Sequence, residues 1–199
     1  MSDTREYILK TSLLLFLQKC YRDVTMKELV EKTGLSKGAF YHHFKGKEAL
    51  FREIVNLFFS LGAIDYNSFD QQNLYNFYHQ YVEHVGASWI KINDFVGDSN
   101  EDNTFNFFLI IFEAIKRFPE YLKMEHEMYY TDLQAWTKVI KNARKNSEIK
   151  SHTSDKQLAA LFLLCSDGVF IRNINNDKKS GFKTNLMQAF DNIYNCLGI

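Results

Sequence analysis

Apolar residues recur along most of the chain at spacings of three and four, the period that places side chains on one face of an α-helix. Such stripes cover about residues 71–92, 104–118 and 120–146, and two more follow toward the end of the chain. The stretch 104–118 is apolar almost all round, which is typical of a helix buried on most sides. The chain has a single proline, Pro119, between two of these stretches. The pattern therefore predicts an all-α fold.

A shorter stretch, residues 25–47, carries local signals for two short helices joined by a tight turn. Thr25 and Glu28 have the spacing of a capping box, so a helix should begin directly after Thr25. Gly34 should end that helix, because glycine adopts a positive φ without steric cost. Ser36 is a good N-cap for the next helix. Two short helices around a tight turn indicate a helix-turn-helix, whose second helix enters the DNA major groove.

The second of these helices has two different faces. Phe40 and Phe44 are four residues apart, so both rings should point into a small core. The other face presents small, basic and aromatic residues, namely Lys37, Gly38, Ala39, Tyr41, His42 and His43. Small residues allow the backbone to approach a base edge closely. Adjacent His42 and His43 point about 100° apart on a helix, which argues against one metal ion between them.

The run from Gly34 to Leu50, GLSKGAFYHHFKGKEAL, resembles the TetR (tetracycline repressor) family of bacterial transcription regulators. The resemblance implies a helix-turn-helix DNA-binding domain over residues 1–48. It implies a helical effector-binding and dimerisation domain over residues 49–199. One position departs from the family, since Cys20 stands where a glycine usually ends the first helix. If that residue needs a positive φ, cysteine adopts it at a cost of about 1 kcal/mol.

The resemblance also assigns roles to the residues of the motif. Lys37, Ala39 and His42 would face base edges. The residues that would mostly hold phosphates are Thr25, Lys27, Tyr41, His43 and Lys47. Base contacts specify the sequence and phosphate contacts position the protein. The alternative is that these side chains form an ordinary solvated helix face.

The charge distribution supports a contact with phosphates at one end of the chain. The net charge is zero, yet residues 1–50 hold nine Lys and Arg against six Asp and Glu. The remaining residues are acidic by the same margin of three charges. A basic head on an acidic body fits a protein that touches DNA with one end only.

The aromatic-rich body is predicted to hold a small-molecule effector, because ligand pockets are mostly apolar with a few placed polar groups. The candidate effector residues are His84, Trp89, Phe105, Phe108, Phe112, Glu113 and Trp136. The alternative is that these aromatic residues simply form a packed core. The effector itself would be apolar or aromatic.

The last two apolar stripes are predicted to be helices, and Ser154 with Gln157 has the capping-box spacing that opens the first of them. In the TetR family these two helices pair with their copies in a second subunit. The resemblance therefore implies a homodimer interface that contains Leu161, Cys165, Val169, Leu186, Phe190, Ile193 and Leu197. The alternative is that the stripes pack only within one subunit.

Several other classes are disfavoured by what the sequence lacks. It shows no Gly-rich phosphate loop, no HExxH motif and no GxSxG elbow, so we predict that it is not an enzyme. Three scattered cysteines fit neither a disulfide framework nor a zinc site, and we expect no metal or cofactor. No stretch is apolar enough for a membrane span and no signal peptide is recognised, so we expect a cytoplasmic protein.

These observations together predict a ligand-responsive DNA-binding regulator. The expected form is a repressor that a small molecule releases from a palindromic double-stranded DNA operator. An activator of the same fold, a helical protein-interaction module without DNA binding, and a helical enzyme with a similar fragment remain as alternatives. The sequence names neither the operator, nor the effector, nor the regulated genes.

Overall fold

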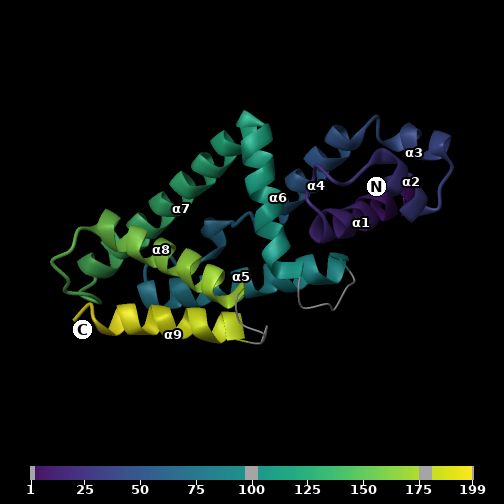
Figure 1. Cartoon of the computed structure of the whole chain (residues 1–199). Helices are drawn as coiled ribbons and strands as arrows, with labels where there is room; N and C mark the ends of the chain where they lie inside the picture. Colours follow the sequence, from purple (N-terminus) through teal and green to yellow (C-terminus); the bar gives the residue numbers. More distant parts are fainter. Residues whose placement is uncertain (1–2, 97–102, 175–180, 199) are drawn as a thin grey trace. The chain divides into compact units, whose positions relative to one another are not determined.

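The computed structural model describes residues 3–96, 103–174 and 181–198, and within these ranges all regular structure is helical (Figure 1). The α-helices are α1 (Asp3–Gln18), α2 (Met26–Thr33), α3 (Lys37–His43), α4 (Lys47–Gly62), α5 (Leu74–Val96), α6 (Asn103–Arg117), α7 (Pro119–Lys145), α8 (Asp155–Ile174) and α9 (Phe182–Asn195), and the 3₁₀ helix η1 covers Tyr66–Ser68. The predicted all-α class is confirmed. Across the described ranges, no helix is long and apolar enough to cross a membrane.

The chain divides into two compact units. Unit 1 comprises Met1–Gly62 and Ile90–Leu122, and unit 2 comprises Ala63–Trp89 and Lys123–Ile199. Helices α5 and α7 each contribute residues to both units. In unit 1, α1 packs against α2, α4 and α6, so the contacts extend beyond the predicted DNA-binding range of residues 1–48. The assignment of DNA binding to residues 1–48 stays a prediction.

The core of unit 1 is built by apolar residues on facing helices. Phe16 of α1 and Phe51 of α4 are both buried, and their rings meet edge to face with centroids 5.1 Å apart. Phe118 lies against Phe51 with a centroid distance of 6.3 Å. The hydroxyl of Tyr121 donates to the backbone oxygen of Arg52 at 3.0 Å, which ties the start of α7 to α4. The periodic apolar positions of α1 and α4 therefore serve one shared core.

The end of α1 differs from the expectation for Cys20. Helix α1 ends at Gln18, and Cys20 lies exposed two residues later. Among the described residues, Ser147 is the one non-glycine residue with a positive φ, at 61°. Cys20 therefore carries no left-handed strain, and the condition for its predicted cost is not met. The chain turns instead through a backbone hydrogen bond from the Asp23 nitrogen to the Cys20 oxygen, at 2.9 Å.

Unit 2 has an aromatic core centred on Trp136. Its fully buried indole lies 5.0 Å from the Phe77 ring, 4.9 Å from Phe162 and 5.5 Å from Phe190, measured between centroids. These rings come from α5, α7, α8 and α9, and α8 and α9 run side by side in Figure 1. Edge-to-face and offset ring pairs contribute beyond the burial of their area. The aromatic content of the body is thus used, in large part, to hold four helices together.

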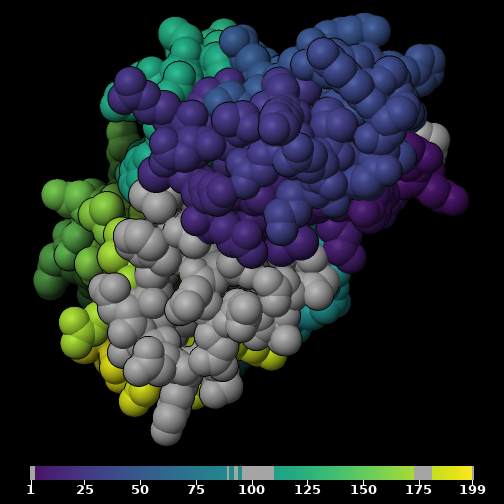
Figure 2. Space-filling model, turned by 45° about the vertical axis from the view of Figure 1, so that its right-hand side comes forward, coloured from purple at the N-terminus to yellow at the C-terminus, as the bar shows by residue number. Residues whose placement is uncertain are grey.

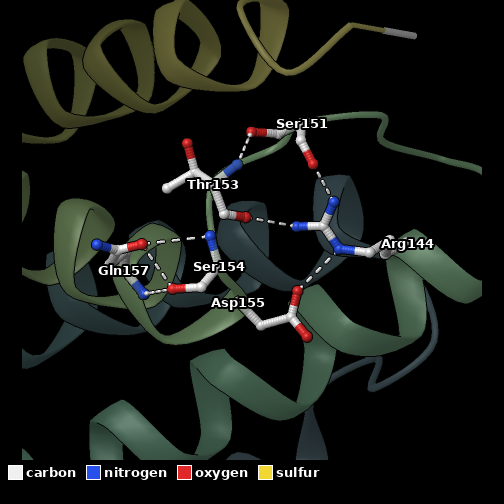
Figure 3. A network of polar contacts seen from close by, with 6 residues as sticks. All are labelled: Arg144, Ser151, Thr153, Ser154, Asp155 and Gln157. Atoms are coloured by element: carbon white, nitrogen blue, oxygen red, sulfur yellow. Dashed lines mark hydrogen bonds and ion pairs between the residues drawn. The ribbon is translucent and has the colours of Figure 1, made fainter.

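The capping box predicted at the start of α8 is confirmed (Figure 3). The Ser154 nitrogen donates to Gln157 Oε1 at 3.3 Å, and the Gln157 nitrogen donates to Ser154 Oγ at 3.4 Å. Arg144, near the end of α7, adds a second set of bonds. Its guanidinium binds Asp155 Oδ1 at 2.9 Å and the Thr153 oxygen at 2.8 Å. This network fixes the connection between α7 and α8.

Candidate nucleic-acid interface

Helix α2 begins where the sequence predicts. Thr25 has extended backbone angles, and its hydroxyl accepts a hydrogen bond from the Glu28 nitrogen at 3.2 Å. This satisfies one of the free backbone donors of the first turn. The Glu28 carboxylate does not return to Thr25, as a full capping box requires, but binds the ammonium of Lys19. The predicted helix start is therefore confirmed, while the second half of the capping box is replaced by an ion pair to the end of α1.

The turn between α2 and α3 also follows its sequence signals. Gly34 ends α2 with φ 65° and ψ 8°, and its nitrogen donates to the Glu31 oxygen at 3.2 Å. A side chain at this φ would be strained, which explains why glycine stands here. Ser36 then starts α3, and its hydroxyl accepts a hydrogen bond from the Ala39 nitrogen at 3.2 Å. These caps fix how α3 leaves the turn.

Helix α3 has the two faces that the sequence predicts. Phe40 and Phe44 are buried, with ring centroids 6.4 Å apart. The opposite side is exposed at Lys37, Gly38, Ala39 and His42, while Tyr41 and His43 are half-buried. A Cβ added to Gly38 would meet no atom within 4 Å, so the space beside this backbone is open. In Figure 2, the side chains of residues 3–62 form the continuous purple-to-blue surface of unit 1.

The other residues predicted to touch DNA occupy two different environments. Thr25 and Lys27 are exposed at the start of α2, and Lys27 makes a long surface ion pair to Glu31, at 3.7 Å. Lys37 is exposed as well, with its ammonium 5.9 Å from the centroid of the Tyr41 ring. These lysines are free to meet phosphates or base edges. The roles assigned to them stay predictions.

Lys47 differs from the other predicted DNA-binding lysines because its ammonium is held within the fold. It donates to the backbone oxygen of Tyr21 at 2.8 Å and to that of Val24 at 2.6 Å. It also lies 4.3 Å from the centroid of the Tyr21 ring, and Arg117 lies 4.4 Å from the same centroid. Burial, and secondarily the charge of Arg117, lower the pKa of Lys47. Two of its three N–H groups thus join the start of α4 to the α1–α2 connection.

The predicted effector residues that the structure describes are divided between the two units. The side chains of Trp89, Phe105 and Phe108 lie outside the described residues. Of the other four, His84 and Trp136 belong to unit 2, and Phe112 and Glu113 belong to unit 1. Trp136 is fully buried among other rings in the core of unit 2, and its predicted role in effector binding stays a prediction. The Glu113 carboxylate forms an ion pair with Arg117 one turn later.

Unit 2 contains a polar cluster that the sequence did not indicate. The Tyr66 hydroxyl donates to Asp132 Oδ1 at 2.9 Å, and Tyr81 and Ser166 share a hydrogen bond of 3.3 Å. Burial raises the pKa of Asp132 to about 6, and the charge of Asp167 adds to this effect. No spacing rule could have found the cluster, because its members lie on four different segments of the chain.

The predicted dimer residues differ in how far they are exposed. Leu186, Phe190 and Leu197 are buried in the core of unit 2, and their predicted contact with a second subunit stays a prediction. Cys165, Val169 and Ile193 are half-buried, and Leu161 is exposed. Two further large apolar residues of α8, Leu164 and Ile171, are 62% and 56% exposed. Their spacing from Leu161 places all three along one side of α8.

Comparisons with known proteins agree with this geometry. Residues 8–54 match the model of the family described as bacterial regulatory proteins, tetR family. Residues 8–54 therefore form an N-terminal domain of the TetR type. The transcriptional regulator YerO of Bacillus subtilis is 50% identical over 50 residues, which are 25% of this chain and 17% of that protein. The repressor NemR of Escherichia coli is 43% identical over 47 residues, or 24% of each chain.

Two solved structures of regulators extend the likeness to the whole fold. A tetR-family regulatory protein from Rhodococcus RHA1 has a TM-score of 0.64 at 15% identity and covers 100% of this chain and 98% of its own. The MbdR regulator from Azoarcus has a TM-score of 0.62 at 18% identity, with 94% and 98% covered. At these identities the likeness concerns the fold alone.

The likeness to the relatives found by sequence covers only a small part of their length. The matched stretch spans only 17% and 20% of the two Bacillus subtilis relatives, YerO and YuxN. YerO, NemR and QacR of Staphylococcus aureus are all transcriptional regulators. This agrees with the prediction that the chain is not an enzyme.

Proposed function

We propose that this protein is a sequence-specific DNA-binding transcriptional repressor that acts as a homodimer. The observation that carries the proposal is helix α3, which presents exposed Lys37, Ala39 and His42 and an open backbone at Gly38. Its other face is anchored by buried Phe40, and both ends of the turn before it are capped. A rigidly held, exposed and basic helix after a tight turn is what a major-groove reader requires.

One copy of α3 would read only a few base pairs, because few side chains reach base edges. Two copies on one dimer would read two half-sites, which is why we propose a palindromic operator. The exposed side of α8, with Leu161, Leu164 and Ile171, supports the homodimer. Gly168 lies on the same helix, and no atom lies within 4 Å of the place of an added Cβ, so another helix could approach closely. Exposed apolar stripes of this kind favour a contact with a second copy.

We further propose that a small molecule regulates DNA binding, as the resemblance to the TetR family implies. The half-buried His84 in unit 2 has a buried Nε2 without a hydrogen-bond partner among the described residues. A buried polar atom of this kind favours a polar partner from a ligand. A repressor fits the names of relatives such as NemR, and a cytoplasmic location goes with this role. An activator of the same fold remains the second candidate.

The experiment for DNA recognition begins with selection of bound fragments from genomic DNA by the full-length protein. Three exposed lysines are then replaced by alanine, and affinity is measured by fluorescence anisotropy. Lys37→Ala should lower affinity for the selected fragment by about 1–3 kcal/mol and relax the sequence preference at one position. Lys27→Ala should weaken binding to all sequences alike. Lys141→Ala, a matched change in unit 2, should leave affinity unchanged.

The opposite pattern would refute the assignment of α3. If Lys37→Ala weakens binding to all DNA sequences equally, this lysine contacts phosphate rather than a base. If no fragment is selected and Lys27, Lys37 and Lys141 variants behave alike, the protein is not a DNA-binding regulator. The interaction-module alternative would then be favoured.

The dimer is tested on the exposed side of α8. Leu164→Glu should convert a dimer into a monomer in light scattering coupled to gel filtration, since a buried unpaired carboxylate is costly. Ile90→Glu is the matched control, because Ile90 is also 62% exposed but belongs to unit 1. A dimer that survives Leu164→Glu would place the interface elsewhere.

A further inference from the structure

Unit 1 contains a cavity of about 250 Å³ beside the helix-turn-helix. The end of α1, the residues that follow it, α4 and α6 enclose this cavity. Its floor is apolar and comes from three helices, with buried Phe16, Phe51 and Ile110. Tyr21, which stacks on Phe16 with a centroid distance of 5.8 Å, forms an aromatic wall.

The rim of the cavity carries an exposed ring and a set of charges. Phe112, on α6, is 63% exposed, which is unusual for a side chain of this size and adds an aromatic surface at the opening. Glu113 is neutralised by Arg117, and Lys19 is neutralised by Glu28. Lys116 is exposed and has no ion-pair partner among the described residues. The rim therefore offers one uncompensated positive charge beside an apolar floor.

We infer that this cavity binds a small aromatic carboxylate. Its ring would lie on Phe16, Phe51 and Ile110, and its carboxylate would meet the Lys116 ammonium. Typical pockets for drug-sized ligands run from about 300 to 1,000 Å³, so this smaller volume suits a ligand of one or two rings. An aromatic acid joins the two properties that the lining combines, an apolar aromatic surface and one free cation.

The site differs from the effector site proposed for unit 2. All of its lining residues belong to unit 1, and two of them, Phe112 and Glu113, were assigned by the sequence to a single effector pocket with Trp136. A ligand here would touch both α1 and α6. Because α1 also packs against α2, the bound ligand would stiffen the support of the helix-turn-helix. The site therefore provides a second route by which a small molecule could change DNA binding.

The test is calorimetric titration of the full-length protein with 2-naphthoate, without DNA. The neutral isostere 2-naphthamide is titrated in parallel. Two variants probe the site: Cys20→Trp fills the cavity from an exposed position, and Lys116→Gln removes the charge. Their matched controls are Cys196→Trp, at an exposed cysteine of unit 2, and Lys91→Gln, at an exposed lysine of unit 1 that does not line the cavity.

The proposal predicts saturable binding of one 2-naphthoate per chain and its loss in the Cys20→Trp variant. Lys116→Gln should weaken the binding of 2-naphthoate about two- to fivefold, as expected for an exposed ion pair, and leave the binding of 2-naphthamide unchanged. The two controls should bind like the unmodified protein. Circular dichroism shows whether the Cys20→Trp variant folds. If it does not fold, the proposal is tested by comparing the binding of 2-naphthoate and 2-naphthamide to the Lys116→Gln variant.

Three results would overturn the proposal. They are the absence of saturable binding, binding that survives Cys20→Trp in a folded protein, and an equal effect of Lys116→Gln on both probes. The second result would place the probe elsewhere, such as in unit 2. Because no DNA is present, each of these outcomes is independent of whether the protein binds an operator.

Discussion

Replacing Lys47 by methionine should destabilise the fold far more than a surface lysine replacement does. Methionine keeps most of the aliphatic stem and removes the ammonium, which donates to the backbone oxygens of Tyr21 and Val24. Hydrogen bonds from charged groups contribute about 1.5–3 kcal/mol each. Lys47 is half-buried, so the low end of that range applies to both bonds. The free energy of unfolding should therefore fall by about 3 kcal/mol.

Urea denaturation followed by circular dichroism measures this loss. All variants are compared at one protein concentration, because the stability of a dimer depends on it. Lys45→Met is the matched control, since Lys45 is exposed and, among the described residues, donates only to the Tyr41 oxygen one turn earlier, at 3.2 Å. The control should change the unfolding free energy by less than about 0.5 kcal/mol. Equal losses for the two variants would refute the structural role of Lys47.

The same variant separates two roles of Lys47 on DNA. Its third N–H is not used by the bonds to Tyr21 and Val24, so the predicted phosphate contact remains possible. If Lys47 makes that contact, its replacement should flatten the dependence of binding on salt by about one unit. A loss of stability with an unchanged salt slope would mean that Lys47 acts only within the fold.

Three further changes test other parts of the structure by urea denaturation. Asp132→Asn should raise the unfolding free energy by up to about 3 kcal/mol at pH 8. Burial and the charge of Asp167 raise the pKa of Asp132 in the folded protein to about 6, above the ordinary 3.8, so the ionised carboxylate destabilises the fold above about pH 6. The gain from Asp132→Asn should therefore vanish below about pH 4, where the carboxyl group is protonated in both states. An equal gain at pH 8 and below pH 4 would contradict this prediction. Ser154→Ala should cost about 1 kcal/mol by removing the α8 cap, and no loss would show that the cap is dispensable. Gly34→Ala should cost about 1–2 kcal/mol because φ is 65°, whereas Gly46→Ala should cost less, and equal costs would contradict the role of the turn geometry.

Features that depend on neighbours in the chain could be predicted from the sequence. The caps at Thr25, Ser36 and Ser154 and the left-handed Gly34 all form within four residues of their partners. Backbone geometry and side-chain chemistry are then enough to place them. The same local signals located α3, which is why the candidate DNA-binding face is seen where it was predicted.

Features that depend on distant partners could not be predicted. Leu186 and Phe190 form an apolar stripe on α9, but a stripe shows that a face is buried and not what covers it. Lys47 binds backbone oxygens, and no residue type marks an available carbonyl in a sequence. Phe112 and Trp136 looked equivalent as aromatic residues of the body, yet one is exposed in unit 1 and the other buried in unit 2.

The salt dependence of binding to a selected genomic fragment shows whether α3 and the residues around it bind DNA. We predict that each α3 helix and its flanking residues contact phosphates through several basic side chains, twice per dimer. Each phosphate contact lowers the slope of log affinity against log salt by about 0.9, so the slope should lie at about −4 or below. It should become about one unit flatter for each copy of Lys27 removed from a contact. A slope near zero, or one that Lys27→Ala leaves unchanged, would contradict this prediction.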